Sequence, residues 1–171
     1  MHRLLAALTL LLVSTLAWAV PLWPPMDTPT FVAKSTDIVI VRCINPDVLG
    51  GAKTDGLTLI EVEVVAIVKG KRQPGTTRLG TIGQPMEAGK RYMIASFGGN
   101  VFNTGFLAQS DQAVTEVPAD FDLKTLAGKT PVQQAQAIFD ARRAQIERLL
   151  GQLQQEKKTL DHTVLRPNAN K

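Results

Sequence analysis

The chain has 171 residues, of which 44% are hydrophobic and 20% are charged, with a formal net charge of +4 at neutral pH. This length suits one compact domain that buries a substantial core. The positive excess is small and scattered along the chain, so it argues against nucleic acid or an anionic lipid surface as the partner. A single cysteine cannot form a disulfide within the chain, and we therefore expect packing to stabilise the fold.

Residues 1–19 have the three-part pattern of a secretory signal peptide. A short basic start containing Arg3 is followed by an apolar run over residues 4–13 and by the small-x-small sequence AWA. The pattern predicts cleavage before Val20 and a periplasmic or secreted mature protein. The alternative is an uncleaved membrane anchor, but the run is shorter than the ~20 residues that span a bilayer. We expect no stable membrane anchor once the signal has been removed.

The next segment, VPLWPPMD at residues 20–27, contains three prolines and is predicted to be stiff and without regular structure. We take Val20, Pro21, Leu22 and Trp23 as candidate partner contacts, because a stiff segment at a free N-terminus loses little conformational entropy on binding. Trp23 has the alternative of simply covering the domain. This segment is therefore one predicted contact region.

A short helix is predicted to follow, because Thr28 and Pro29 have the residue types preferred at an N-cap and a first helical position. In these two helical turns, the side chains of Phe31 and Val32 would face the core of the domain. A similar pair, Thr130 and Pro131, predicts a helix that runs to about Leu160 within a helical region over residues 119–161.

That second helix carries an apolar stripe at helical spacing. Its end, with Leu149, Leu150 and Leu153, suits packing on the rest of the domain or on a second copy of the chain. The stripe is lost from Gln154, so we expect the last turns to project or fray, and residues 162–171 to be a disordered tail.

Between the helices, apolar residues recur with the period of two that is typical of strands. In residues 37–44, Val39, Val41 and Cys43 form one wholly apolar face, which we expect to be the core face. Residues 57–70 are the clearest strand, apolar at every even position from 60 to 68. The other face of this strand becomes apolar partway along, which predicts a bend or bulge, as in a small closed barrel.

Further strands are predicted over residues 76–83, in the second part of residues 86–97 after a turn, and over 113–118, with a hairpin over 98–109. The loops over 46–56 and 98–105 are predicted contact regions, and Asn100 and Phe102 are candidate contacts in the second. Five or so strands at this spacing indicate a barrel or sandwich over residues 28–118. The fold class is therefore mainly β with α.

The sequence shows no complete catalytic or cofactor-binding motif. LAGKTPVQ resembles the end of a phosphate-binding loop, but Leu123 stands where the first glycine belongs. His162 is the one histidine of the predicted mature chain, which argues against a histidine-based triad. Cys43 lacks a histidine partner, and we expect a buried thiol, with an intermolecular disulfide or catalysis as the alternatives.

The acidic residues give a similar result. Asp120 and Asp122 have the spacing of calcium ligands, but the other ligands are missing, so helix capping is the preferred interpretation. An enzyme that uses Glu61, Glu63 and these two aspartates is a further alternative. We expect the chain to hold no metal and no cofactor, and not to be an enzyme.

The order of elements resembles the netrin-like domain, which also forms the inhibitory domain of tissue inhibitors of metalloproteinases. The matching stretches are TPTFVAKSTDIVIVRC, LIEVEVVAIVKG and MEAGKRYMIASF, within residues 28–118. The resemblance implies an OB-fold, a five-stranded Greek-key barrel, as in uncharacterised secreted bacterial proteins. The inhibitors of that family act through an N-terminal cysteine held by disulfides. Here the predicted N-terminus is Val20, so that mechanism does not carry over.

These observations favour a non-catalytic exported binding or interaction module whose partner is an unknown envelope or extracellular protein. The motivation is a well-patterned core without a catalytic constellation. The alternative is a peptidase inhibitor that inserts VPLWPP into a cleft. The candidate contacts common to both hypotheses are Val20, Pro21, Leu22, Trp23, Asn100 and Phe102.

Overall fold

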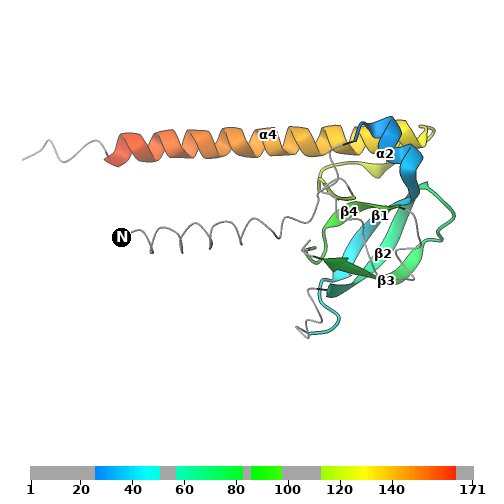
Figure 1. The fold of residues 1–171 in the computed structure, drawn as a ribbon. Coiled ribbons are helices and arrows are strands. Elements are labelled where there is room, and N and C mark those ends of the chain that lie inside the picture. Colours follow the sequence, from blue (N-terminus) through cyan, green and yellow to red (C-terminus); the bar gives the residue numbers. More distant parts are fainter. Residues whose placement is uncertain (1–25, 51–56, 83–85, 98–112, 165–171) are drawn as a thin grey trace, which may run out of the picture.

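A computed structural model describes residues 26–50, 57–82, 86–97 and 113–164. The elements are a short helix, five antiparallel strands, a 3-10 turn and a long helix (Figure 1). In chain order they are α2 (Thr28–Lys34), β1 (Ser35–Asn45), β2 (Leu57–Lys69), β3 (Gly75–Ile82), β4 (Arg91–Phe97), β5 (Val114–Val117), η1 (Leu123–Leu126) and α4 (Pro131–Val164). The mixed composition of strands and two helices agrees with the predicted fold class.

The five strands form one sheet in the order β3-β2-β1-β4-β5, with β1 at its centre. Every pairing is antiparallel. Within the described residues the sheet is open, and β3 and β5 are its edges. The predicted final strand is therefore an edge strand, which ends before Pro118.

Strand β1 is buried on both faces, because a layer of side chains packs on each side of it. Val39, Val41 and Cys43 are at most 1% exposed, which confirms the predicted core face. Ile38 and Ile40 on the opposite face are also fully buried, since α2 and α4 cover them. The preference for a single core face was therefore wrong.

The two layers form separate hydrophobic clusters. The inner layer lies on the face of β1 that carries Cys43, and consists of Val39, Val41, Cys43, Ile60, Val62, Val64, Leu79, Met86, Tyr92 and Ile94. The helix layer joins the other face to α2, η1 and α4, and consists of Phe31, Val32, Ile38, Ile40, Val68, Met93, Ala95, Val117, Leu126, Ala135 and Ile138. The sheet thus separates two cores.

Strand β2 contains the predicted bulge. Val41 of β1 lies opposite Val64, but the preceding Ile40 lies opposite Ala66, so Val65 is an additional residue in β2. An added residue shifts the alternation of side chains by one position. Val64 consequently belongs to the inner layer, whereas Ala66 packs against the helix layer. The even positions do not share one face, as the sequence pattern suggested.

Helix α2 begins one residue earlier than predicted. The N-cap is Asp27, whose carboxylate accepts a hydrogen bond from the Thr30 backbone N–H at 2.7 Å, and Thr28 is the first helical residue. Aspartate and threonine are both good N-caps, so residue type alone did not decide between the adjacent positions. At the other end, the Lys69 ammonium group donates to the backbone oxygens of Val32 and Ser35, both at 2.6 Å.

Helix α4 begins as the sequence predicts. The Thr130 backbone N–H donates to the Gln133 side chain at 3.0 Å, and the Gln133 N–H donates to the Thr130 hydroxyl at 3.3 Å. These reciprocal bonds form a capping box. The helix continues to Val164, beyond the predicted end, so the first positions of the predicted disordered tail are helical. Its first half packs on the sheet and the rest projects beyond it (Figure 1).

Candidate functional site

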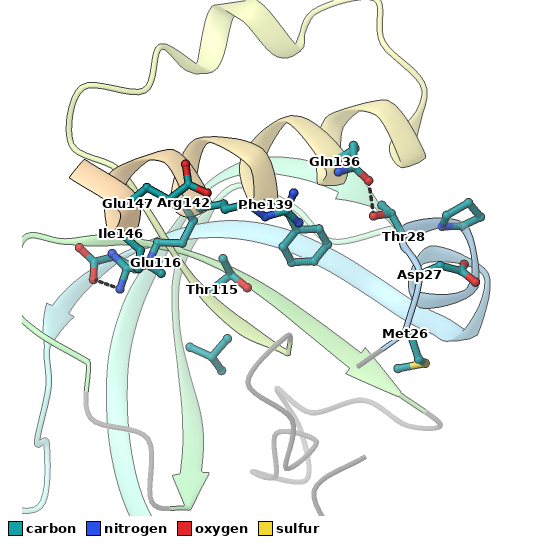
Figure 2. A pocket seen from close by; sticks show the side chains of 13 residues that line it. Met26, Asp27, Thr28, Thr115, Glu116, Gln136, Phe139, Arg142, Ile146 and Glu147 are labelled. Atoms are coloured by element: carbon teal, nitrogen blue, oxygen red, sulfur yellow. Dashed lines mark hydrogen bonds and ion pairs between the residues drawn. The ribbon is translucent and has the colours of Figure 1, made fainter. Parts of the chain in front are cut away.

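A cavity of about 900 Å³ opens between the start of α2, the edge strand β5 and the middle of α4. Three segments that are distant in the sequence form its walls (Figure 2). The lining consists of Met26, Asp27, Thr28, Pro29, Val114, Thr115, Glu116, Gln136, Phe139, Arg142, Arg143, Ile146 and Glu147. Its volume lies at the upper end of what ligand sites usually offer.

One part of the wall is apolar and is held by the core behind it. The Phe139 ring packs edge-on against the Phe31 ring, with centroids 5.2 Å apart, and so joins the cavity to the helix layer. Met26, Val114 and Ile146 provide further apolar surface. Ile146 is 43% exposed, so its apolar surface is open to a ligand in the cavity.

A second part of the wall is charged. Arg142 of α4 pairs with Glu116 of β5 at 3.2 Å, and Lys90 approaches the same carboxylate at 3.7 Å. Arg142 also donates to Gln145 at 2.7 Å, which fixes the direction of the guanidinium group. The carboxylate thus faces two cations, and the ion pair links helix to strand directly below the opening (Figure 2).

The remaining polar contact ties the two helices together. The Thr28 hydroxyl donates to the Gln136 side-chain oxygen across the cavity's edge (Figure 2). Together with the Arg142–Glu116 pair, this bond fixes all three walls to one another. The cavity is therefore largely pre-formed, as small-molecule and peptide sites usually are.

The predicted contact residues Val20, Pro21, Leu22, Trp23, Asn100 and Phe102 lie outside the described residues. Of the loop 46–56, residues 46–50 are described. The two other predicted contact segments nevertheless have informative attachment points. Residues 20–25 lead directly into Met26, and the chain that follows the predicted loop over 98–105 leads through residues 106–112 into Ala113 and Val114. Met26 and Val114 both line the cavity.

The sequence did not predict the cavity itself, because its residues come from three segments with no common motif. Arg142 interrupts the apolar stripe of α4, and this interruption was the one available signal. A charged residue in a buried stripe usually has a partner, but the sequence does not show that the partner is Glu116.

The thiol of Cys43 is buried in the inner layer, as predicted. Burial in apolar surroundings raises the pKa of this thiol above its ordinary value of 9.0. The thiol is therefore neutral at physiological pH, which is a poor state for a nucleophile.

The acidic candidates form separate structural contacts. Asp122 caps η1 by accepting from the Lys124 N–H at 2.9 Å, whereas Asp120 pairs with Arg148 at 3.4 Å. Helix capping is thus confirmed for one aspartate and wrong for the other. Glu61 and Glu63 lie near Arg78 and Arg42 respectively, on the outer surface of β2.

Among the described residues, no group of three or more histidine, cysteine or acidic side chains is placed so that it could hold a metal ion. In the same part of the chain, no helix has the length and apolar character needed to cross a membrane.

The sequence was also compared with known proteins. No family model matches the chain, and no curated protein is significantly similar to it.

Proposed function

We propose that the chain is a non-catalytic exported binding module, periplasmic or secreted, that holds a segment of a protein partner at the cavity between α2, β5 and α4. One observation carries this proposal. The predicted contact segment over residues 20–25 joins the described chain at Met26, and the chain that follows the predicted contact loop over 98–105 re-enters the described structure at Ala113, next to Val114. Met26 and Val114 both lie on the cavity wall, which favours the cavity as the binding surface.

The chemistry of the cavity suits a polypeptide. Phe139 and Ile146 offer apolar area to one side chain, while Arg143 and Glu147 at the rim offer charge of both signs to a peptide's polar groups. An apolar centre with a polar rim is the usual organisation of protein interfaces. The half-buried Arg142–Glu116 pair stabilises the walls and remains engaged during binding.

The order of strands supports a relation to five-stranded barrels. If β3 and β5 were brought together, the open sheet would close into a ring, and the OB-fold is itself a partly open barrel. The bulges in the pairing of β1 with β2 favour such curvature. We therefore keep the OB-fold-like barrel and the netrin-like resemblance as part of the proposal.

A peptidase inhibitor is the second candidate. It is favoured by the position of Met26, since the stiff segment VPLWPP would begin at the cavity and extend from it. Inhibition of a responsive peptidase should then fall when residues are added before Val20. Unchanged inhibition by the extended protein would exclude this mechanism.

The binding proposal is tested by photo-crosslinking in intact cells that export the chain. A benzophenone amino acid is placed at Ile146, on the cavity wall, and in a matched variant at Thr76, an exposed position on β3. Proteins captured from the first position are identified by mass spectrometry. We expect one partner to be captured reproducibly at Ile146 and not at Thr76.

The captured partner is then purified and titrated with the unmodified protein. Ile146→Asp should weaken the affinity at least about tenfold, which corresponds to about 1.4 kcal/mol, because it removes apolar contact area and adds a desolvation cost. Thr76→Asp serves as the control and should leave the affinity unchanged. Equal capture at both positions, or equal affinity of both variants, would contradict a binding site at the cavity.

A further inference from the structure

The cavity between α2, β5 and α4 is elongated along α4 and has two different ends. Figure 2 shows Met26 and Gln136 at one end, and Ile146 and Glu147 at the other. Gln136 and Ile146 are ten positions apart in α4, so the cavity follows this helix for about 15 Å. The first end is tied by the bond of Gln136 to α2, and the second carries a carboxylate.

The chain itself joins the cavity at the first end. Residues 20–25, with the sequence VPLWPP, are linked covalently to Met26. Three of these six residues are prolines, and Val20 and Trp23 each precede a proline, so the sequence favours an extended backbone of the polyproline type. At about 3.1 Å per residue, the segment is about 19 Å long, which is enough to run along the whole cavity.

We propose that residues 20–25 of the mature chain lie in this cavity, with Trp23 on its apolar wall and the amine of Val20 at Glu147. The proposal names the occupant of the cavity in the absence of a partner. It rests on the export stated in the proposed function, because cleavage before Val20 creates this amine. A segment of a partner would bind by displacing residues 20–25, and the released residues would then be available to contact the same partner.

The length of the segment places Trp23 at the middle of the cavity. Trp23 is three residues before Met26, or about 9 Å along a polyproline backbone. An equal distance along α4 from Gln136 passes Phe139 and ends at Arg142. The indole ring would therefore meet the Phe139 ring, which is the most extensive apolar surface of the wall.

A cation on the same wall suits an indole ring. The guanidinium group of Arg143 lines the cavity, pairs with Asp140 at 3.8 Å and remains 69% exposed. Tryptophan is the aromatic side chain that attracts a cation most strongly over its ring face. Arg143 and Phe139 together thus provide the two kinds of surface that Trp23 can use.

Charge complementarity gives the direction of the segment. Glu147 is eleven positions after Gln136, or about 16 Å further along α4. Among the described residues, the Glu147 carboxylate forms no ion pair. The ammonium group of Val20 ends a segment about 19 Å long, so it reaches this carboxylate when the segment runs from Met26 along the helix.

The covalent attachment favours this occupant over a free ligand. A segment tethered beside its site by a short linker has an effective concentration of about millimolar. The prolines lower the conformational entropy that is lost when the segment is ordered. Weak contacts are therefore enough to hold residues 20–25 in the cavity, and a partner that binds more tightly can still replace them.

Tryptophan fluorescence of the purified mature protein, without a partner, tests the proposal. Trp18 leaves with the signal peptide, so Trp23 is the sole tryptophan of the mature chain. Its acrylamide quenching constant should be at least about threefold lower in the native protein than in urea. Ile146→Asp should raise the native constant toward the urea value, because it places a charge on the apolar wall. Thr76→Asp, on β3, is the control and should leave it unchanged.

Far-UV circular dichroism checks that both variants are folded. A native quenching constant near the urea value would overturn the proposal, and so would a low constant that folded Ile146→Asp leaves unchanged.

Photo-crosslinking identifies the occupant directly. A benzophenone amino acid at Ile146 of the purified protein should crosslink to residues 20–25 within one chain, and one at Thr76 should not. The product should have the mass of a single chain, and peptide mapping locates the link. Crosslinks from Ile146 to other segments only, or to a second copy, would contradict the proposal.

The contact of the amine is tested by Glu147→Gln. This variant removes the charge that the amine meets and should raise the quenching constant of Trp23 about twofold, whereas Glu156→Gln, on the projecting half of α4, should not change it. Equal constants for the two variants would contradict the direction of the segment. No partner is present in these measurements, so their failure leaves the capture of a partner at Ile146 untouched, and a failed capture leaves them untouched.

Discussion

The two halves of α4 have similar apolar spacing and opposite surroundings. Ala135 and Ile138 in the first half are fully buried against the sheet, whereas Leu153 and Leu160 in the second half are at least 60% exposed. The residue types do not explain the contrast, since leucine is at least as hydrophobic as alanine. The period of a stripe indicates which face is apolar, and the rest of the fold decides how much of that face is covered.

The largest expected effect is a difference in reactivity between a thiol on the projecting half of α4 and the buried thiol of Cys43. A protein carrying Leu153→Cys has one thiol on the projecting half of α4 and its own Cys43 in the inner layer. The introduced thiol should react with a maleimide at the rate of a free thiol, and Cys43 at least about a thousandfold more slowly, because its labelling requires opening of the core. Mass spectrometry over time separates the two reactions. Comparable rates would show that the inner layer opens readily.

The ionisation of Cys43 adds a dependence on pH. Its pKa is raised in the folded state by burial, so the neutral thiol's contribution to stability is present below pH 9.0 and is lost as the pH rises through the folded pKa. Cys43→Ala should remove this part of the alkaline loss of stability in urea titrations.

The next largest effect concerns stability. Ile138→Ala should lower the free energy of unfolding by about 2–5 kcal/mol, because it leaves a cavity in the helix layer. The matched Leu153→Ala should change it by less than about 0.5 kcal/mol, because Leu153 is 60% exposed. Urea unfolding of both variants tests the contrast directly. Equal losses would mean that another surface covers the second half of α4.

A smaller effect is expected at the start of α4. Thr130→Ala removes one side of the capping box and should cost about 1 kcal/mol, whereas Thr130→Ser keeps the hydroxyl and should cost much less. Hydrogen exchange should show the loss of protection in the first turn and not in the projecting half. A loss spread evenly along the helix would contradict independent support of its two halves.

The smallest effect belongs to α2. The Thr30 N–H holds the pKa of the Asp27 carboxyl below its ordinary value of 3.8, so the stabilisation is present above that pH and declines as the pH falls through the folded pKa. Asp27→Asn keeps a good N-cap and should remove this dependence without changing stability at neutral pH. The measurement is thermal unfolding between pH 2 and pH 5. If thermal unfolding of Asp27→Asn depended on pH as that of the unmodified protein does, Asp27 would be excluded as a source of this dependence.

Much of the local structure could be predicted from the sequence. The start of α4 at Pro131, the start of α2 to within one residue, the five strands and the bulge in β2 follow from residue preferences and periodicity, which act over a few neighbouring positions. The helix layer could not be predicted, because Ile38 and Ile40 share their face of β1 with Arg42 and Ile44. Only the packed structure shows that α2 and α4 cover part of that face.

The candidate cavity could not be predicted for a related reason. Its walls come from the start of α2, from β5 and from the middle of α4, and no periodic pattern connects them. The contact between Arg142 and Glu116 depends on where α4 crosses the sheet. Long-range placement of this kind depends on the sum of many packing contacts.

The ammonium group of Lys69 links the sheet to helix α2 by hydrogen bonds. Lys69 is the last residue of β2, yet its three donors reach backbone oxygens at the end of α2. The tilt of α2, and with it the side of the cavity formed by Met26 and Pro29, is therefore coupled mechanically to the paired strands. Lys69 thus adds a second link between α2 and the sheet beside the covalent connection into β1, and acetylation of this amine would remove that second link.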